Sequence, residues 1–130
     1  MSVPEEWFLQ AHIALYRKCM VDPVTGCHVW TGGKKNYGRY GVISFKNHRD
    51  LELRKSIPYS VHRLAYMVAT RQTEIPDRLH VSHLCHQGLC MNIEHLKLEP
   101  PQVNNGRIAC YNAVPRRCLH IHHPYPDCKL

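Results

Sequence analysis

The sequence predicts a small α+β domain with an antiparallel β-sheet. Two stretches have apolar residues at helical spacing, and three short runs between turn residues have the composition of strands. A chain of 130 residues and 15.2 kDa suffices for one domain with a modest hydrophobic core. Seven cysteines and eleven histidines, beside only 8% aromatic residues, indicate that bound metal replaces part of that core.

Helices are predicted over residues 4–19 and about 61–71. Residues 2–5 form a capping-box pattern with a proline just inside the helix. The apolar residues that follow at near-helical spacing are Trp7, Phe8, Ala11, Leu15 and Met20. Ser60 is the expected N-cap of the second helix. The inward face of that helix is predicted to consist of Val61, Leu64, Ala65 and Val68.

Strands are predicted over residues 27–30, 39–45 and 51–57, paired in one antiparallel sheet. Turns at 32–36 and 46–50 separate them, and Pro58 is expected to end the sheet. A further short strand over 79–82 leads into residues 80–107, where thiols and imidazoles are densest.

The charge balance favours a polyanionic partner. The net charge is +7 and the isoelectric point is near 9.2, which points to nucleic acid before an anionic membrane. A basic two- or three-stranded ribbon fits the DNA major groove, so double-stranded DNA is the predicted partner. The alternative is a solvated basic face. The basic side chains of the predicted sheet and its turns are Lys34, Lys35, Arg39, Lys46, His48, Arg49, Arg54 and Lys55.

Membrane insertion and secretion are not expected. No apolar run approaches the ~20 residues that span a bilayer. The first ten residues carry two acidic side chains where a signal peptide would be basic. We therefore expect an intracellular protein, nuclear if its source is eukaryotic, whose reduced thiols are available to metal.

A structural zinc site is predicted from the spacing of three residues. Four residues separate Cys85 from Cys90, and four separate Cys90 from His95, so one loop can bring three donors around a tetrahedral ion. Cys27 is the preferred fourth ligand because it would tie the first strand to the loop. His86 is a weaker alternative, crowded by its neighbour. Four protein ligands leave no open position, so this ion should contribute to folding.

The same stretch resembles the His-Cys box homing endonucleases, members of the wider His-Me finger (ββα-metal, HNH-like) nucleases. The resemblance is close over residues 80–107 and looser elsewhere. It rests on Ser82-His83-Leu84-Cys85-His86, Cys90, Asn92, His95-Leu96 and Asn104-Asn105-Gly106-Arg107. It implies an α+β fold with a His-Me finger core, an antiparallel sheet and two structural zinc sites.

The resemblance also implies a catalytic pair and a phosphate-binding arginine. His83 would end a strand and act as general base on water. Asn104, on the helix that follows, would offer its amide oxygen to Mg²⁺, with Asn105 as its competitor. The arginine should come from the sheet region, where Arg54 and Arg49 are the first candidates and Arg39 the third.

A second zinc is implied for the tail, through three cysteines and a histidine. The implied ligands are Cys110, Cys118, His120 and Cys128. Seven residues lie between His120 and Cys128, longer than the family's interval, so His122 or His123 is an alternative. Residues 1–107 would form the DNA-binding sheet and nuclease core with the first zinc, and 108–130 the zinc-binding tail.

The leading hypothesis is therefore a Mg²⁺-dependent endodeoxyribonuclease stabilised by two zinc ions. The main alternative is a zinc-stabilised DNA-binding module without cleavage activity, and a zinc-organised protein-interaction domain comes third. The chain stops two residues after Cys128, which leaves the homodimer formed through longer tails in doubt. A monomer would nick one strand, and a symmetric dimer would cut both.

Overall fold

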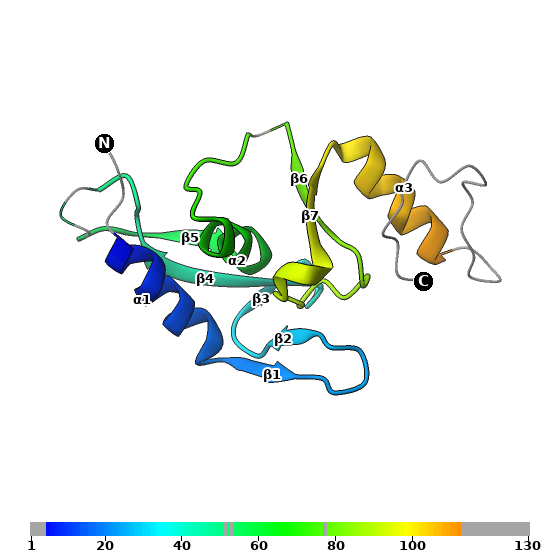
Figure 1. The fold of residues 1–130 in the computed structure, drawn as a ribbon, viewed down its shortest axis with the longest axis horizontal. Coiled ribbons are helices and arrows are strands. Elements are labelled where there is room, and N and C mark those ends of the chain that lie inside the picture. Colours follow the sequence, from blue (N-terminus) through cyan, green and yellow to red (C-terminus); the bar gives the residue numbers. More distant parts are fainter. Residues whose placement is uncertain (1–4, 51, 53, 77, 113–130) are drawn as a thin grey trace.

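The computed structural model describes residues 5–112 except 51, 53 and 77, and within α3 it omits the side chains of residues 106, 107, 110 and 111. Helix α2 (Val61–Thr70) occupies the middle of the molecule and contacts α1, β4, β5, β6 and η1 (Figure 1). The other elements are α1 (Glu5–Tyr16), β1 (Cys19–Val21), β2 (His28–Trp30), β3 (Lys34–Lys35), β4 (Tyr40–Lys46), β5 (Ser56–Ser60), β6 (His80–His83), η1 (Ile93–His95), β7 (Leu96–Glu99) and α3 (Pro101–Asn112). The α+β class and the antiparallel pairing are thus confirmed.

The strands form three small sheets, and this differs from the prediction of a single sheet. The strand at 28–30 pairs with β1, whose first residue, Cys19, was predicted to end the first helix and whose other two residues were not predicted as strand. Strand β4 pairs with β3 on one side and β5 on the other. The third predicted strand, 51–57, was placed too early, because β5 begins at Ser56 after a longer loop.

Pro58 does not end the sheet, contrary to expectation. It lies within β5 opposite Ser44. β5 is an edge strand of the β3–β4–β5 sheet, so the missing N–H of a proline costs no ladder hydrogen bond when it faces outward. The second predicted helix was nearly right: Ser60 is its N-cap, and Arg71 follows it in the left-handed conformation (φ 56°).

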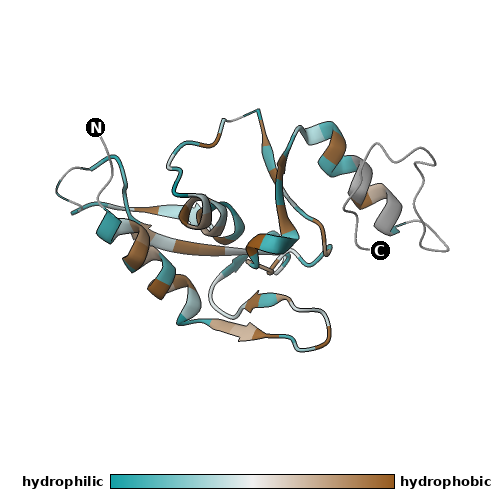
Figure 2. Cartoon of the chain, viewed as in Figure 1, coloured by the Kyte–Doolittle hydropathy of each residue, from teal (hydrophilic) through white to brown (hydrophobic). Residues whose placement is uncertain are grey.

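The hydrophobic core lies where α1 and α2 meet the β4–β5 hairpin. Figure 2 shows hydrophobic residues along these elements. Trp7 and Trp30 are fully buried, and each indole N–H keeps a carbonyl partner, at Lys46 (2.9 Å) and Gly33 (2.8 Å) respectively. Burying these rings is favourable because no polar atom loses its hydrogen bond.

The part that carries the candidate site is β6, β7 and α3, which lie to the right of the core in Figure 1. β6 and β7 are antiparallel, with His80 opposite Glu99 and His83 opposite Leu96. The loop between them holds the predicted zinc ligands, and α3 contacts β6. α3 ends at Asn112. Within the described residues, no helix has both the length and the apolar composition to cross a membrane.

Replacement of Gly41 by alanine should destabilise the fold. An added Cβ would lie 2.5 Å from Trp30 Cδ1 and 2.9 Å from Val61 Cγ2, two immobile core side chains. At Gly33 the nearest heavy atom would be 3.5 Å away. We expect Gly41→Ala to lower the free energy of unfolding by about 1–3 kcal/mol and Gly33→Ala by less than about 0.5 kcal/mol. Chemical denaturation followed by circular dichroism checks this, and equal midpoints would contradict the packing.

Candidate metal centre and adjoining clefts

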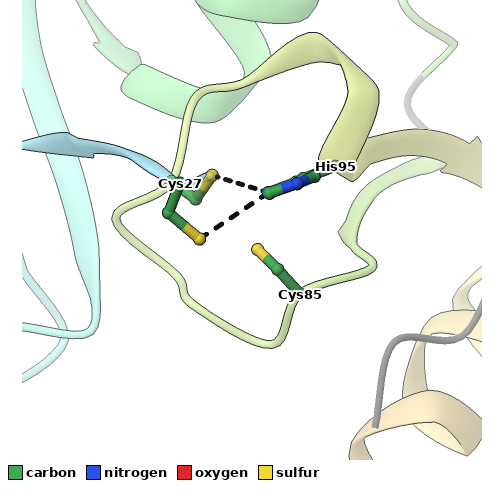
Figure 3. A group of neighbouring side chains, drawn as sticks. Cys27, Cys85 and His95 are labelled. Atoms are coloured by element: carbon green, nitrogen blue, oxygen red, sulfur yellow. Dashed lines mark hydrogen bonds between the residues drawn. The ribbon is translucent and has the colours of Figure 1, made fainter. Parts of the chain in front are cut away.

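Cys27, Cys85, Cys90 and His95 converge on one point. Their ligand atoms, three sulfurs and one ring nitrogen, all lie within 4.8 Å of one another. Figure 3 shows His95 and the sulfurs of Cys27 and Cys85 directed at a common centre. The Nδ1 atom of His95 lies 3.6 Å from the sulfur of Cys27 and 3.5 Å from that of Cys90. The predicted remote ligand, Cys27, is therefore in place, and the fourth position does not require His86.

Backbone hydrogen bonds fix the loop against β2. The Trp30 amide donates to the Leu89 carbonyl (2.9 Å), and the Met91 amide donates to the His28 carbonyl (2.8 Å). These two bonds form a bridge around Val29 and Cys90. The cluster thus joins two segments more than fifty residues apart in sequence. A metal bound there would cross-link the two segments.

The histidine ligand has its own support. His95 ends η1, whose first residues are capped by the Asn92 side chain, which accepts from the Glu94 amide (3.0 Å). The Asn92 amide nitrogen also donates to the Gly26 carbonyl (2.8 Å), one residue before Cys27. One asparagine therefore positions both the histidine and the remote cysteine.

The thiols perturb one another strongly. Burial raises the pKa of Cys27, and the Cys85 side chain together with burial raises that of Cys90, while Cys90 lowers the pKa of Cys85. Adjacent thiols share negative charge poorly, so all three ionise together only with a cation among them. A tetrahedral zinc with Zn–S bonds of ~2.3 Å supplies that charge and would set its sulfurs about 3.8 Å apart.

The donor set fits a structural zinc ion. Soft thiolates and an imidazole in a Cys₃His arrangement select zinc over hard cations. Three of the four ligands are almost fully buried: Cys27 is 3% exposed, Cys90 0% and His95 7%. Such a site stabilises the fold and offers no open position for chemistry.

A second group of polar side chains lies beside this cluster. His83 is the last residue of β6, and Asn104 lies in the first turn of α3, as predicted. Both line two adjoining clefts. The loop-side cleft has a volume of about 380 Å³ and also contains Arg39 and His86. The α2-side cleft has a volume of about 480 Å³ and also contains Lys35, His62, Arg63 and His80.

The tautomer of His83 follows from its contact with the metal loop. Its Nε2 lies 3.2 Å from the Cys90 carbonyl, which can only accept, so Nε2 carries the hydrogen. The lone pair is then on Nδ1. Burial lowers the pKa of His83 to about 4, so the ring is neutral at pH 7. A neutral ring with a fixed tautomer is the form that can accept a proton.

Two aromatic side chains, His62 and Tyr40, lie beside His83. The His62 ring lies 4.6 Å from the His83 ring between centroids, and Tyr40 lies 6.1 Å away. Nδ1 of His62 is buried without a hydrogen-bond partner among the described residues. Burial, followed by the nearby His83, lowers the pKa of His62 to about 3. These contacts follow from the positions of α2, which carries His62, and β4, which carries Tyr40, beside the end of β6.

The predicted arginines lie at different places. Arg49 and Arg54 are on the loop between β4 and β5, and neither lines the two clefts. Arg54 pairs with Glu52 at the surface (2.9 Å). Arg39, the third candidate, does line the loop-side cleft. The Arg39 carbonyl packs so closely against Gly88 that a Cβ added at Gly88 would collide with it. The loop between β6 and β7 therefore lies directly against the turn between β3 and β4.

The ligands predicted for the tail lie outside the described residues. Cys118, His120 and Cys128 fall in the range 113–130, together with the alternatives His122 and His123. Cys110 lies on α3, but its side chain is not among those described.

The described region is thus an α+β domain with a Cys₃His cluster that can hold a metal ion. The family described as the zinc-binding loop region of homing endonuclease matches residues 26–128. The chain belongs to that family, which confirms the resemblance to His-Cys box homing endonucleases and indicates a nuclease-related role. Searches of curated proteins and of solved structures found no match.

Removal of one ligand should release one metal ion. Cys85→Ala should reduce the zinc content by one per chain and lower the melting temperature, because the ion's binding free energy contributes to folding. Cys19→Ala is the matched control, since Cys19 is also half-buried but lies outside the cluster. Metal analysis and thermal unfolding measure both effects. Equal zinc contents in the two variants would rule out this ligand set.

Proposed function

We propose that this protein is a Mg²⁺-dependent DNA endonuclease with a His-Me finger core. The proposal is supported above all by one arrangement: His83, neutral and with its Nδ1 lone pair available, lines the same two clefts as Asn104. The order β6, metal loop, β7, α3 agrees with a ββα-metal core. Membership of a homing-endonuclease family supports the reaction class.

In this proposal His83 activates the attacking water. Nδ1 accepts the proton while the Cys90 carbonyl holds the ring through Nε2, so the ring keeps its orientation as it becomes charged. That carbonyl also offsets part of the positive charge that develops. Proton transfer of this kind contributes about 10²–10⁴-fold to the rate. The zinc loop therefore serves catalysis by placing the carbonyl.

Asn104 is the proposed ligand of a hard divalent cation. Its side chain is half-buried at the cleft wall, and an amide oxygen with phosphate oxygens and water makes a suitable Mg²⁺ site. When bound, Mg²⁺ supplies Lewis-acid stabilisation of the departing 3′ oxygen. The asparagine fixes where that stabilisation is applied relative to His83.

Double-stranded DNA is the proposed substrate. The +7 net charge favours a polyanion, and both clefts carry basic side chains at their walls: Arg39 in one, Lys35 and Arg63 in the other. Of the arginines considered from the sequence, Arg39 is the one beside His83 and Asn104. We therefore assign the scissile phosphate to Arg39 in place of Arg54 and Arg49.

A second structural zinc in the tail remains part of the proposal. It would be held by Cys110, Cys118, His120 and Cys128, which lie within the matched range 26–128. The Cys85→Ala variant would then retain one zinc per chain. Homodimerisation, which would convert single-strand nicking into double-strand cleavage, is an independent proposal.

Replacement of either proposed catalytic residue should stop cleavage without preventing binding. We expect His83→Ala and Asn104→Ala to reduce nicking of supercoiled plasmid by about 10²–10⁴-fold. His12→Ala, an exposed histidine on α1, should leave the rate unchanged. Plasmid conversion in Mg²⁺ or EDTA gives the rate, and fluorescence anisotropy gives binding. Full cleavage by His83→Ala would refute its role; binding without cleavage by the unaltered chain would favour a DNA-binding module.

The two arginine assignments can be separated directly. Arg39→Ala should slow cleavage by at least tenfold, because a charge-assisted bond to phosphate is worth about 1.5–3 kcal/mol. Arg54→Ala removes the same charge from an exposed loop and should change cleavage less than threefold. Single-turnover rates at saturating enzyme measure the step after binding. The reverse ranking would restore the assignment to Arg54.

A further inference from the structure

We propose that His80 is a positioning residue that fixes the side-chain amide of Asn104, so that its oxygen and not its nitrogen faces the divalent cation. The inference rests on the proposed function, since it concerns the same cleft. The Asn104 Nδ2 atom lies 3.3 Å from the Nδ1 atom of His80. Both side chains line the α2-side cleft together with His83.

The contact arises from the strand register. His80 begins β6 and lies opposite Glu99, the last residue of β7, just before α3 starts at Pro101. The first turn of α3 must therefore fold back over the start of β6, and the two elements are in contact. Asn104 comes within reach of His80 as a result. Asn105, the competitor for the same role, is exposed.

The chemistry of the two groups gives the contact a direction. An amide nitrogen only donates, so Nδ1 of His80 accepts and the ring proton is on Nε2. The amide oxygen then remains for a cation. Rotation of the amide by half a turn would turn its N–H groups toward the cation, and His80 would have to move its ring proton from Nε2 to Nδ1 to keep the contact. An acceptor at Nδ1 of His80 therefore supports the orientation in which the amide oxygen faces the cation.

This orientation role differs from a direct contact with DNA. A histidine that held phosphate would change DNA affinity. A histidine that orients the side chain of residue 104 changes the affinity for the cation. It does so only if that side chain ends in two different atoms, as the oxygen and nitrogen of an amide are. In an Asn104→Asp chain the side chain has oxygen at both ends, so the contribution of His80 should largely disappear there. That contrast separates positioning from general support of the fold.

The test measures cation binding in chains that carry His83→Ala, so that DNA is bound but not cut. Mn²⁺ is titrated into the protein with a short DNA duplex present, and electron paramagnetic resonance gives the dissociation constant of the cation. Asn104→Ala measures the Mn²⁺ binding that does not depend on Asn104. His80→Phe keeps a ring without an acceptor and should weaken Mn²⁺ binding roughly threefold to tenfold, the worth of one hydrogen bond. His80→Asn keeps an acceptor near the Nδ1 position and should restore affinity to within about twofold.

Three controls complete the design. In the Asn104→Asp background, His80→Phe should change Mn²⁺ affinity by less than about twofold. Zinc content and circular dichroism should match across all variants. In chains with His83 restored, half-saturating Mg²⁺ for cleavage should rise in His80→Phe by the same factor as the Mn²⁺ constant, while DNA affinity stays unchanged.

The outcomes distinguish the two levels of the proposal. Mn²⁺ binding that depends on Asn104 but ignores His80→Phe would overturn the role of His80 alone. An equal loss with Asn104 intact and in the Asn104→Asp background would also overturn it. Absence of any Asn104-dependent Mn²⁺ binding would overturn the proposed function together with this inference.

Discussion

The tie between Cys27 and the β6–β7 loop is the constraint on which the site depends. The loop contributes Leu84 and Met91 to the buried core, but its backbone bonds to β2 involve only a few residues. Three thiols and an imidazole lie within 4.8 Å of one another, so a metal bound among them would fix the path of the loop. In a domain with so few aromatic residues, a metal bound at this cluster would provide stability that a larger protein obtains from a larger hydrophobic core.

The same constraint reaches the second site through Cys90. The sulfur of this residue belongs to the metal cluster, and its carbonyl accepts the hydrogen bond that sets the tautomer of His83. A change in the loop therefore alters the orientation of the histidine as well as the stability of the fold. Structure and proposed chemistry are coupled by one residue, so a loss of activity in a ligand variant is not evidence of catalysis by the zinc ion.

The sequence was most informative where chemistry depends on local spacing. The intervals among Cys85, Cys90 and His95 predicted the cluster, and Cys27 completed it as expected. Strand pairing was harder to predict. β1 and β7 were not predicted as strands, and Pro58 was expected to end the sheet, because the edge position of a strand is not visible in a sequence. The His80–Asn104 and His62–His83 contacts depend on register between distant segments, which no periodicity encodes.

The two sites use opposite chemistry, and this keeps their proposed ions apart. The buried cluster offers soft sulfur and imidazole donors, which prefer zinc. The adjoining clefts offer an amide oxygen beside histidines whose low pKa values keep them neutral, so a hard cation meets no competing positive charge from those rings. In the proposed mechanism burial does more than support the fold, because it keeps the proposed base His83 uncharged before the reaction, next to the proposed Mg²⁺ site.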